Sequence, residues 1–303
     1  MEGAGGDVRR EGRLVPTLDA ARLRGWREPP LRHAWTATDS ILYALGLGLG
    51  TDPCDESQLR FVHEPRLLAL PTLATVLAPR FGWLYRTGAG IDPRLCVHAH
   101  QGLRIHRPLP SAGEVVGGLE ITHLVDKGAG QGAIVHFRRD LRDAADGGLL
   151  ATLDASMFCR GHGGFGGERE GPPAASAVPD RSPDGRWEWP TFPQQALLYR
   201  QSGDRNPLHS DPEVARAAGF PQPVLHGLCS YGIAACILMR ERLGWDPQAL
   251  RSLDARFVSP VFPGETLVLE CWDEPDGVRF RCGVKERGTV ALDRGVLNGS
   301  TAA

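Results

Sequence analysis

Three side chains with complementary chemistry lie close together in the segment YRQSGDRNPLHSDP, which runs from residue 199 to residue 212. Asp204 supplies a carboxylate, Asn206 an amide and His209 an imidazole. An imidazole exchanges protons near neutral pH, and a carboxylate can act beside it as the second acid or base. An amide can orient a water molecule without titrating. Together the three groups could therefore hold and activate one water molecule.

The local sequence predicts that these residues lie on a loop. Positions five apart on an α-helix differ by about 140° in direction, so Asp204 and His209 would not share a helical face. Pro207 would also break a helix. A tight turn can instead aim all three side chains at one point. The alternative is a hydrogen-bonded turn without chemistry, where Asp and Asn are common, and residue types alone leave both interpretations open.

The residues after His209 predict a short capped helix. Ser210 or Asp211 would be its N-cap, Pro212 its first residue, and Gly219 would lie near its end. We therefore interpret Asp211 as a cap and not as a chemical group.

Other patterns that could carry chemistry are weaker. GHGGFG at 161–166 fits G-x-G-x-x-G, but a Gly/Pro-rich stretch follows it in place of the helix that nucleotide binding requires. No usual zinc spacing occurs between His209 and Cys229, and no G-x-S-x-G motif is present. Cys229 lies in an apolar helical run, which favours a buried structural thiol. We expect neither a nucleotide cofactor nor a metal.

Two halves of similar plan must position the loop. A segment rich in Gly, Pro, Ala and Ser at 161–186 is predicted to be a linker. Strand-like runs dominate the end of each half, and each half has apolar helical sequence ahead of them. The strand-like runs are LCVHAHQGLRIHRPL, EVVGGLEITHLVDKG, GAIVHFRRDLRD and LLATLDASMFCR in the first half and SLDARFVSPVF, TLVLECWDE and GVRFRCGVKERG in the second. The helical runs are SILYALGLGL with LLALPTLATVLAPRF in the first half and LHGLCSYGIAACILMRERLG in the second. A helix followed by antiparallel strands predicts an α+β fold in which a sheet wraps a buried helix.

Two similar segments, one in each half, support the interpretation that the halves arose by duplication. GLRIHRPLPSAGEVV and DARFVSPVFPGETLV share an Arg, a Pro, a turn and a Gly-Glu pair in the same order. Pro108 corresponds to Pro260 at an offset of 152, and Glu114 corresponds to Glu265 at an offset of 151. A chance match of one pair of segments is the alternative.

Composition limits the partners and the setting. The net charge of −2 and the absence of a Lys/Arg cluster argue against a nucleic-acid or membrane surface. Seven scattered cysteines predict free thiols in a reducing compartment. No secretory signal is recognisable, so we expect a cytoplasmic protein. Residues 1–30 are expected to form an N-terminal extension, for which disorder is one alternative.

At this point the segment can be compared with a known family. YRQSGDRNPLHSDPEVARAAGFPQPVLHGLCSYG closely resembles the hydratase 2 motif of the MaoC-like family, the (R)-specific 2-enoyl-CoA hydratases. The blocks DSILYALGLG, LRFVHEPRLLALPT, RGHGGFGG and ARFVSPVFPGETL resemble further parts of the same two-half enzymes.

The resemblance implies a double hot-dog fold, in which two repeats each wrap an antiparallel sheet around a long central helix. Residues 31–160 would form a non-catalytic repeat that accommodates the acyl chain, and residues 187–296 the repeat with the catalytic loop. The substrates would be coenzyme A thioesters. Water would add reversibly to a trans-2-enoyl thioester to give the (3R)-hydroxyacyl product, with no metal or redox cofactor and with coenzyme A as part of the substrate.

The resemblance also implies roles for individual residues. Asp204 and His209 would share the water, with either of them starting the proton transfer, and Asn206 would position the water or His209. Gly227, at the helix start beside His226, would offer its N–H to the thioester oxygen, although close packing alone also explains a glycine there. The supporting positions that match the family are Tyr199 and Glu64.

Three alternatives stay open at this stage. The same chemistry could run as dehydration of a 3-hydroxyacyl thioester, carried by CoA or by acyl carrier protein. A non-catalytic acyl-CoA-binding subunit is a second possibility. Because the chain already holds two repeats, either a monomer or a homodimer is compatible with it.

Overall fold

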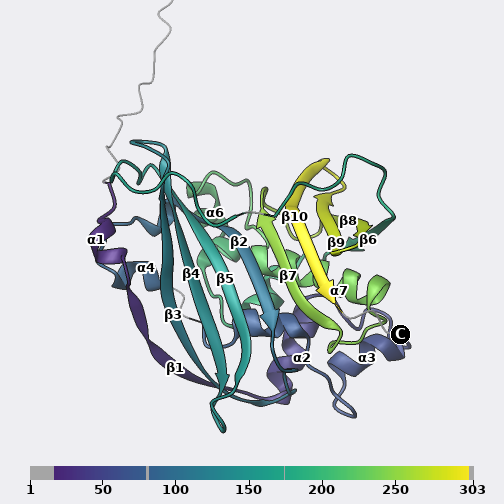
Figure 1. The fold of residues 1–303 in the computed structure, drawn as a ribbon. Coiled ribbons are helices and arrows are strands. Elements are labelled where there is room, and N and C mark those ends of the chain that lie inside the picture. The colour runs from purple at the N-terminus through teal and green to yellow at the C-terminus, as the bar shows by residue number, and fades with distance from the viewer. Residues whose placement is uncertain (1–16, 80–81, 174, 300–303) are drawn as a thin grey trace, which may run out of the picture.

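One ten-stranded antiparallel sheet dominates the computed structural model, which describes residues 17–79, 82–173 and 175–299 (Figure 1). The strand order is β1-β3-β4-β5-β2-β7-β10-β9-β8-β6. The first five strands along the chain are β1 (Arg27–Trp35), β2 (Cys96–Ile105), β3 (Gly113–Asp126), β4 (Gly132–Asp143) and β5 (Leu149–Arg160). The other five are β6 (Gly185–Pro190), β7 (Leu250–Phe257), β8 (Thr266–Glu274), β9 (Gly277–Val284) and β10 (Thr289–Gly299).

The strand order confirms the duplication. Read from either edge, the sheet presents the equivalent strands of the two halves in the same sequence and ends on β2 or β7, which pair at the centre. In that central pair Gly102 lies opposite Asp254. These two residues are separated by the same offset of 152 as Pro108 and Pro260. Equivalent positions of the two repeats therefore face each other across a local two-fold axis.

The long helix predicted for the second half is present as α7 (Gly227–Arg242). It lies behind the sheet in Figure 1 and packs against β7, β8 and β10. Its eleven residues from Cys229 to Met239 are all buried. A helix that is apolar on all sides is expected to be enclosed by the core, so the composition of this run explains its place.

The first half departs from the prediction. SILYALGLGL forms α2 (Ala37–Gly46), which a capping box between Thr36 and Asp39 begins. The second apolar run forms only the short 3-10 helix η1 (Pro71–Val76) and not a long α-helix. Three of its six residues are β-branched, which disfavours a longer helix, and Ala78 has a positive φ of 45° that ends any continuation.

The shorter elements complete the description. They are α1 (Ala20–Leu23), α3 (Glu56–Val62), α4 (Trp83–Arg86), η2 (Pro93–Leu95), α5 (Gln195–Tyr199), η3 (Arg200–Ser202), η4 (Pro207–His209) and α6 (Pro212–Ala217). Within the predicted extension at 1–30, the alternative of disorder is wrong for residues 17–30. Residues 17–30 carry α1 and the start of β1, and Leu18 and Leu23 are buried. Residues 1–16 lie outside the described residues.

The Gly-rich segment at 161–166 binds a carboxylate of the protein itself. The N–H groups of Gly164 and Gly166 donate to the carboxylate of Asp126 at 2.7 Å each, and Gly128 N–H donates at 2.8 Å. Burial would raise the pKa of Asp126, but the amide donors outweigh burial and hold the pKa below its usual value. Two backbone N–H groups of the G-x-G-x-x-G segment, those of Gly164 and Gly166, are therefore already used. The linker ends where β6 begins at Gly185, inside its predicted range.

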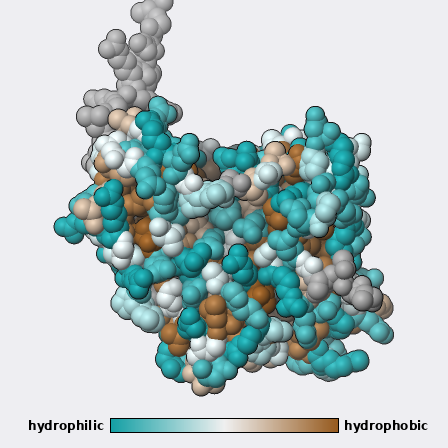
Figure 2. Space-filling model, viewed as in Figure 1, coloured by the Kyte–Doolittle hydropathy of each residue, from teal (hydrophilic) through white to brown (hydrophobic). Residues whose placement is uncertain are grey.

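The outer surface is mixed in character. On the face in Figure 2, hydrophilic residues cover most of the molecule and hydrophobic residues occur in scattered patches. Among the described residues, no helix combines the length and the apolar character that a membrane crossing needs.

Candidate active site

The segment that suggested chemistry forms a compact loop between α5 and α6. Gly203 has a positive φ of 117°, which reverses the chain after η3. Asn206 then caps the single 3-10 turn η4, with Pro207 as its first residue and His209 as its last. The loop predicted from Pro207 and from the spacing of Asp204 and His209 is confirmed. It brings the two side chains close together, and both residues are half-buried.

The environment of His209 makes one ring nitrogen available as a base. Its Nδ1 lies 2.8 Å from the carbonyl oxygen of Val224. A carbonyl only accepts, so Nδ1 carries the proton in the neutral ring and Nε2 keeps its lone pair. Burial lowers the pKa of His209, although the Val224 carbonyl and Asp204 both oppose that effect. His209 is therefore held as a neutral imidazole with Nε2 ready to accept a proton.

His226 holds both His209 and the backbone of Asp204 in place. Its ring stacks on that of His209 with centroids 3.7 Å apart and planes at 23°. Its Nε2–H donates to the backbone oxygen of Asp204 at 3.0 Å, which ties the loop to the start of α7. Burial, and to a smaller extent the neighbouring His209, lower the pKa of His226 to about 3. A neutral His226 can stack against His209 without repulsion.

Asp204 joins the two imidazoles. One ligand-type atom from each of Asp204, His209 and His226 lies within 4.8 Å of the other two. In the described part of the chain this is the one His/Cys/Asp/Glu group that close. The three groups are therefore close enough to act together on one small molecule.

Asn206 has a demonstrable structural role. Its Oδ1 accepts from Leu208 N–H at 3.0 Å, while its own N–H donates to the Asp204 carboxylate at 3.1 Å. These bonds form the hydrogen-bonded turn that was the alternative to chemistry, and they also aim the Asp204 carboxylate. The residue as a whole is exposed. Asp211 is confirmed as the cap of α6, since it accepts from Glu213 N–H at 2.8 Å.

Gly227 opens α7, and as the first helical residue its N–H has no acceptor within the helix. The residue is exposed. A Cβ at this position would lie 3.0 Å from the ring of Phe257. Close packing therefore accounts for the glycine, and the same exposure leaves its N–H reachable at the positive end of a sixteen-residue helix.

The two supporting residues differ in placement. The ring of Tyr199 lies 5.0 Å from that of His226 and 5.8 Å from that of Tyr43. Its hydroxyl is buried without a hydrogen-bond partner, and burial raises its pKa well above 10. Glu64 is exposed on the loop after α3 and makes no ion pair or side-chain hydrogen bond with another described residue. The structure thus brings Tyr199 to the site and leaves Glu64 out of this cluster.

Two residues of the site were missed by sequence reasoning. Arg200 follows Tyr199 directly, and its charge lowers the pKa of both His209 and His226. Tyr43 lies in the apolar run of α2. Its hydroxyl, a polar group in an otherwise apolar run, was the available sequence signal for a role in the site. Its hydroxyl is buried and unpartnered like that of Tyr199. A basic residue inside the motif was the signal for Arg200.

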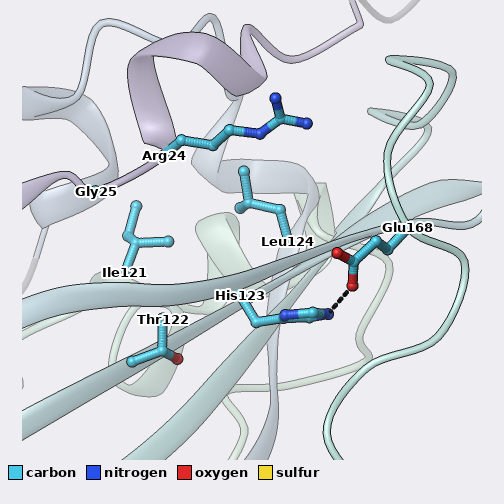
Figure 3. Close-up of a pocket in the computed structure, with 7 residues that line it drawn as sticks. All are labelled: Arg24, Gly25, Ile121, Thr122, His123, Leu124 and Glu168. Carbon is cyan, nitrogen blue, oxygen red and sulfur yellow. Dashed lines mark ion pairs between the residues drawn. The ribbon is translucent and has the colours of Figure 1, made fainter.

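A shallow groove elsewhere is separate from this site. Figure 3 shows it between the α1 turn and β3, with the ion pair of His123 and Glu168 at one side. Its lining residues include none of the loop residues that form the acid–base cluster. The groove therefore adds no group to the site.

Comparison with known proteins identifies the family. The model of the MFE-2 hydratase 2 N-terminal domain matches residues 33–161, and that of the MaoC like domain matches residues 174–294. The chain is 43% identical over 278 residues to 3-hydroxyacyl-thioester dehydratase Y of Mycobacterium tuberculosis, covering 88% of this chain and 94% of that one. It is 38% identical over 280 residues to the peroxisomal enoyl-CoA hydratase 2 of Arabidopsis thaliana, covering 87% and 90%.

A solved structure agrees with these matches. The crystal structure of a MaoC-like dehydratase from Phytophthora capsici superposes with a TM-score of 0.81 at 33% identity, covering 92% of this chain and 96% of that one. Together with the symmetric sheet and the buried α7, this confirms the predicted double hot-dog fold. The chain belongs to the MaoC-like hydratase 2 family.

Proposed function

We propose that this protein adds water reversibly to the double bond of trans-2-enoyl-CoA thioesters and so forms (3R)-3-hydroxyacyl-CoA. The observation that carries the proposal is the proximity of the Asp204 carboxylate to the His209 imidazole, whose Nδ1 is tied to the Val224 carbonyl so that Nε2 keeps its lone pair. The relatives named enoyl-CoA hydratase 2 and 3-hydroxyacyl-thioester dehydratase support the reaction class.

The proposed mechanism uses one water molecule. Asp204 and His209 hold the water, and His209 Nε2 accepts one of its protons as the oxygen attacks the β-carbon. The resulting enolate takes a proton at its α-carbon from the same acid–base pair, on the same face. The water thereby supplies both the hydroxyl group and the added hydrogen, and the pair returns to its starting protonation state. His226 acts as a positioning residue, because it orders His209 and the backbone of Asp204.

The negative charge that develops on the thioester oxygen needs a fixed donor. Gly227 N–H is the proposed donor, supported by its exposure and by its place at the start of α7. Hydration changes no oxidation state overall, so we propose that the reaction needs no redox cofactor. We also propose that Asp204, His209 and the Gly227 N–H activate the water and the thioester without a resident metal. Coenzyme A enters only as part of the substrate. The cytoplasmic location and the choice between a monomer and a homodimer stay predictions.

The reverse direction is a second candidate physiological role. The 43% identity to a 3-hydroxyacyl-thioester dehydratase supports dehydration as this second candidate. Comparison of kcat/KM for the same acyl group on CoA and on acyl carrier protein distinguishes the carriers. A non-catalytic binding subunit would not require the acid–base geometry that Asp204 and His209 retain.

The test is a hydration assay with chiral product analysis. Purified protein is incubated with crotonyl-CoA and trans-2-decenoyl-CoA, and the product is offered to a (3S)-specific dehydrogenase. We expect loss of the enoyl absorbance and no signal from the dehydrogenase. A (3S) product would contradict the proposed (3R) stereochemistry. Binding of enoyl-CoA without turnover would contradict the proposal that the protein is an enzyme.

A further inference from the structure

An arginine stands on the core-facing side of the first repeat. Arg139 lies on β4, where Val135 and Leu141 point to the same side and are fully buried. Across the sheet it lies opposite Leu119 of β3 and Leu153 of β5, which are also buried. A strand position surrounded by apolar neighbours is an unusual place for a cation.

This cation has no anionic partner in the described part of the chain. Its guanidinium donates to the carbonyl oxygens of Thr75 at 2.7 Å and Ala78 at 3.3 Å, both at the end of η1. Burial alone lowers the pKa of Arg139 to about 10, and no carboxylate raises it. The preceding residue, Arg138, faces the other side of the sheet and pairs with Asp154 at 2.8 Å. Of these two neighbouring arginines, Arg138 has a carboxylate partner and Arg139 has none among the described residues.

The guanidinium retains unused donors. An arginine carries five N–H donors in a planar fork, and the two carbonyl bonds occupy one donor each on the terminal nitrogens. The residue remains partly exposed, so these donors are not sealed by protein atoms. Leaving a cation unpaired in low-dielectric surroundings costs free energy, which an anion at this point would offset.

Two chains of contacts connect Arg139 with the active site. The first runs from His226 to the ring of Tyr199, whose hydroxyl neighbours that of Thr75, the residue whose carbonyl binds Arg139. The guanidinium therefore lies on the first-repeat side of the acid–base cluster.

The second chain starts at Gly227, which packs against Phe257. The ring of Phe257 lies 4.7 Å from that of His98. Burial is the main cause that lowers the pKa of His98, and the charges of His100 and, to a smaller extent, Arg139 act in the same direction. Nε2 of His98 is buried and has no hydrogen-bond partner. These contacts extend from the proposed thioester position to the surroundings of Arg139.

From these contacts we propose that Arg139 binds a carboxylate at the far end of the acyl chain, so that preferred substrates are 2-enoyl thioesters with a terminal acid group. The inference rests on the proposed hydration activity. A carboxylate matches the planar fork of arginine with two parallel hydrogen bonds. The alternative is that Arg139 only caps the carbonyls of η1, which would make it indifferent to the end of the chain.

The test compares matched substrates. Enoyl-CoA thioesters of equal length, ending either in a methyl or in a carboxylate group, are assayed with wild type over a series of medium-length chains. We expect a higher kcat/KM for at least one acid-ended substrate than for its methyl-ended match. In Arg139→Met, kcat/KM for the acid-ended substrate should fall by at least about tenfold, as expected for removing one partner of a buried charge pair. The methyl-ended substrate should change little.

Control variants distinguish carboxylate binding by Arg139 from a purely structural role and from a contact with the CoA phosphates. Arg139→Lys keeps the charge and should retain part of the preference, while Arg138→Met on the outer face should leave the preference unchanged. Equal losses on both substrates would overturn the proposal in favour of a structural cap or a contact with the CoA phosphates. A wild type that hydrates methyl-ended substrates but never prefers the acid-ended ones also overturns it. If neither substrate is hydrated, the proposed function itself fails. If Arg139→Met does not fold, the wild-type preference and Arg139→Lys still decide.

Discussion

The imidazole rings of His209 and His226 stack with centroids 3.7 Å apart, and each is tied to a backbone carbonyl through one nitrogen. The two carbonyls, of Val224 and Asp204, select opposite nitrogens for protonation. His209 consequently presents Nε2 as a lone pair, and His226 presents Nδ1. This pair orders the catalytic loop against the start of α7.

The first prediction concerns the acid–base pair. Asp204→Asn and His209→Gln should each lower kcat for crotonyl-CoA hydration by at least about 100-fold, because each removes a proton-transferring group. Asn at 204 can still accept from Asn206 N–H, so the turn should persist. Asp211→Asn is the matched control, since asparagine caps helices as well as aspartate does. Near wild-type turnover in either site variant would contradict the mechanism.

The second prediction is the pH dependence of the reaction. Burial lowers the pKa of His209, so the acid limb of kcat/KM should lie below about 6.5, the ordinary histidine value. The charge of Arg200 acts in the same direction. Arg200→Met should therefore move the limb to higher pH, which a pH profile of kcat/KM measures. A shift to lower pH would show that Arg200 does not act through His209.

The third prediction is the pH dependence of stability. The pKa of His226 is about 3 in the folded protein and ordinary in the unfolded chain. Below the ordinary value the unfolded state binds a proton that the folded state does not, so stability is present at higher pH and is lost as the pH falls toward 3. One such group contributes a slope of up to about 1.4 kcal/mol per pH unit.

Denaturant unfolding between neutral and acidic pH measures this slope. In His226→Gln the slope of the unfolding free energy against pH should be smaller by the contribution of one titrating group. Glutamine keeps an N–H donor for the Asp204 carbonyl but does not bind a proton in this pH range. The half-buried His98 and His136, each with a pKa lowered to about 4 mainly by burial, contribute to the remainder. An unchanged slope would show that His226 is not the buried neutral group described.

The fourth prediction isolates the N–H of Gly227. Gly227→Pro removes the donor, whereas Gly227→Ala keeps it, and both place a Cβ near the Phe257 ring. Proline is tolerated at the first position of a helix, so α7 should persist. We expect kcat of the proline variant to lie roughly 100-fold below that of the alanine variant, the cost of one oxyanion donor. Equal kcat values in two folded variants would assign the glycine to packing alone.

Much of the fold could be predicted from local patterns. The apolar run of α7, the four strands β2 to β5 and the strands β7 to β9 follow from composition and turn residues. The edge strands β1 and β6 and the last strand β10 were not predicted. REPPLRHAW holds two prolines and three charged residues, and an edge tolerates these because one side of the strand pairs with nothing.

The sequence by itself determined that Asp204, Asn206 and His209 share one loop, because Pro207 and the spacing exclude a common helix. It also determined the duplication and the apolar helix that follows. Only the tertiary structure decided which nitrogen of His209 is free, since the deciding carbonyl belongs to Val224, fifteen residues further along the chain. The stacking of His226, the displacement of Glu64 and the unpaired charge of Arg139 were decided in the same way. Burial and pairing depend on which distant segments pack together, and a single side chain's type does not carry that information.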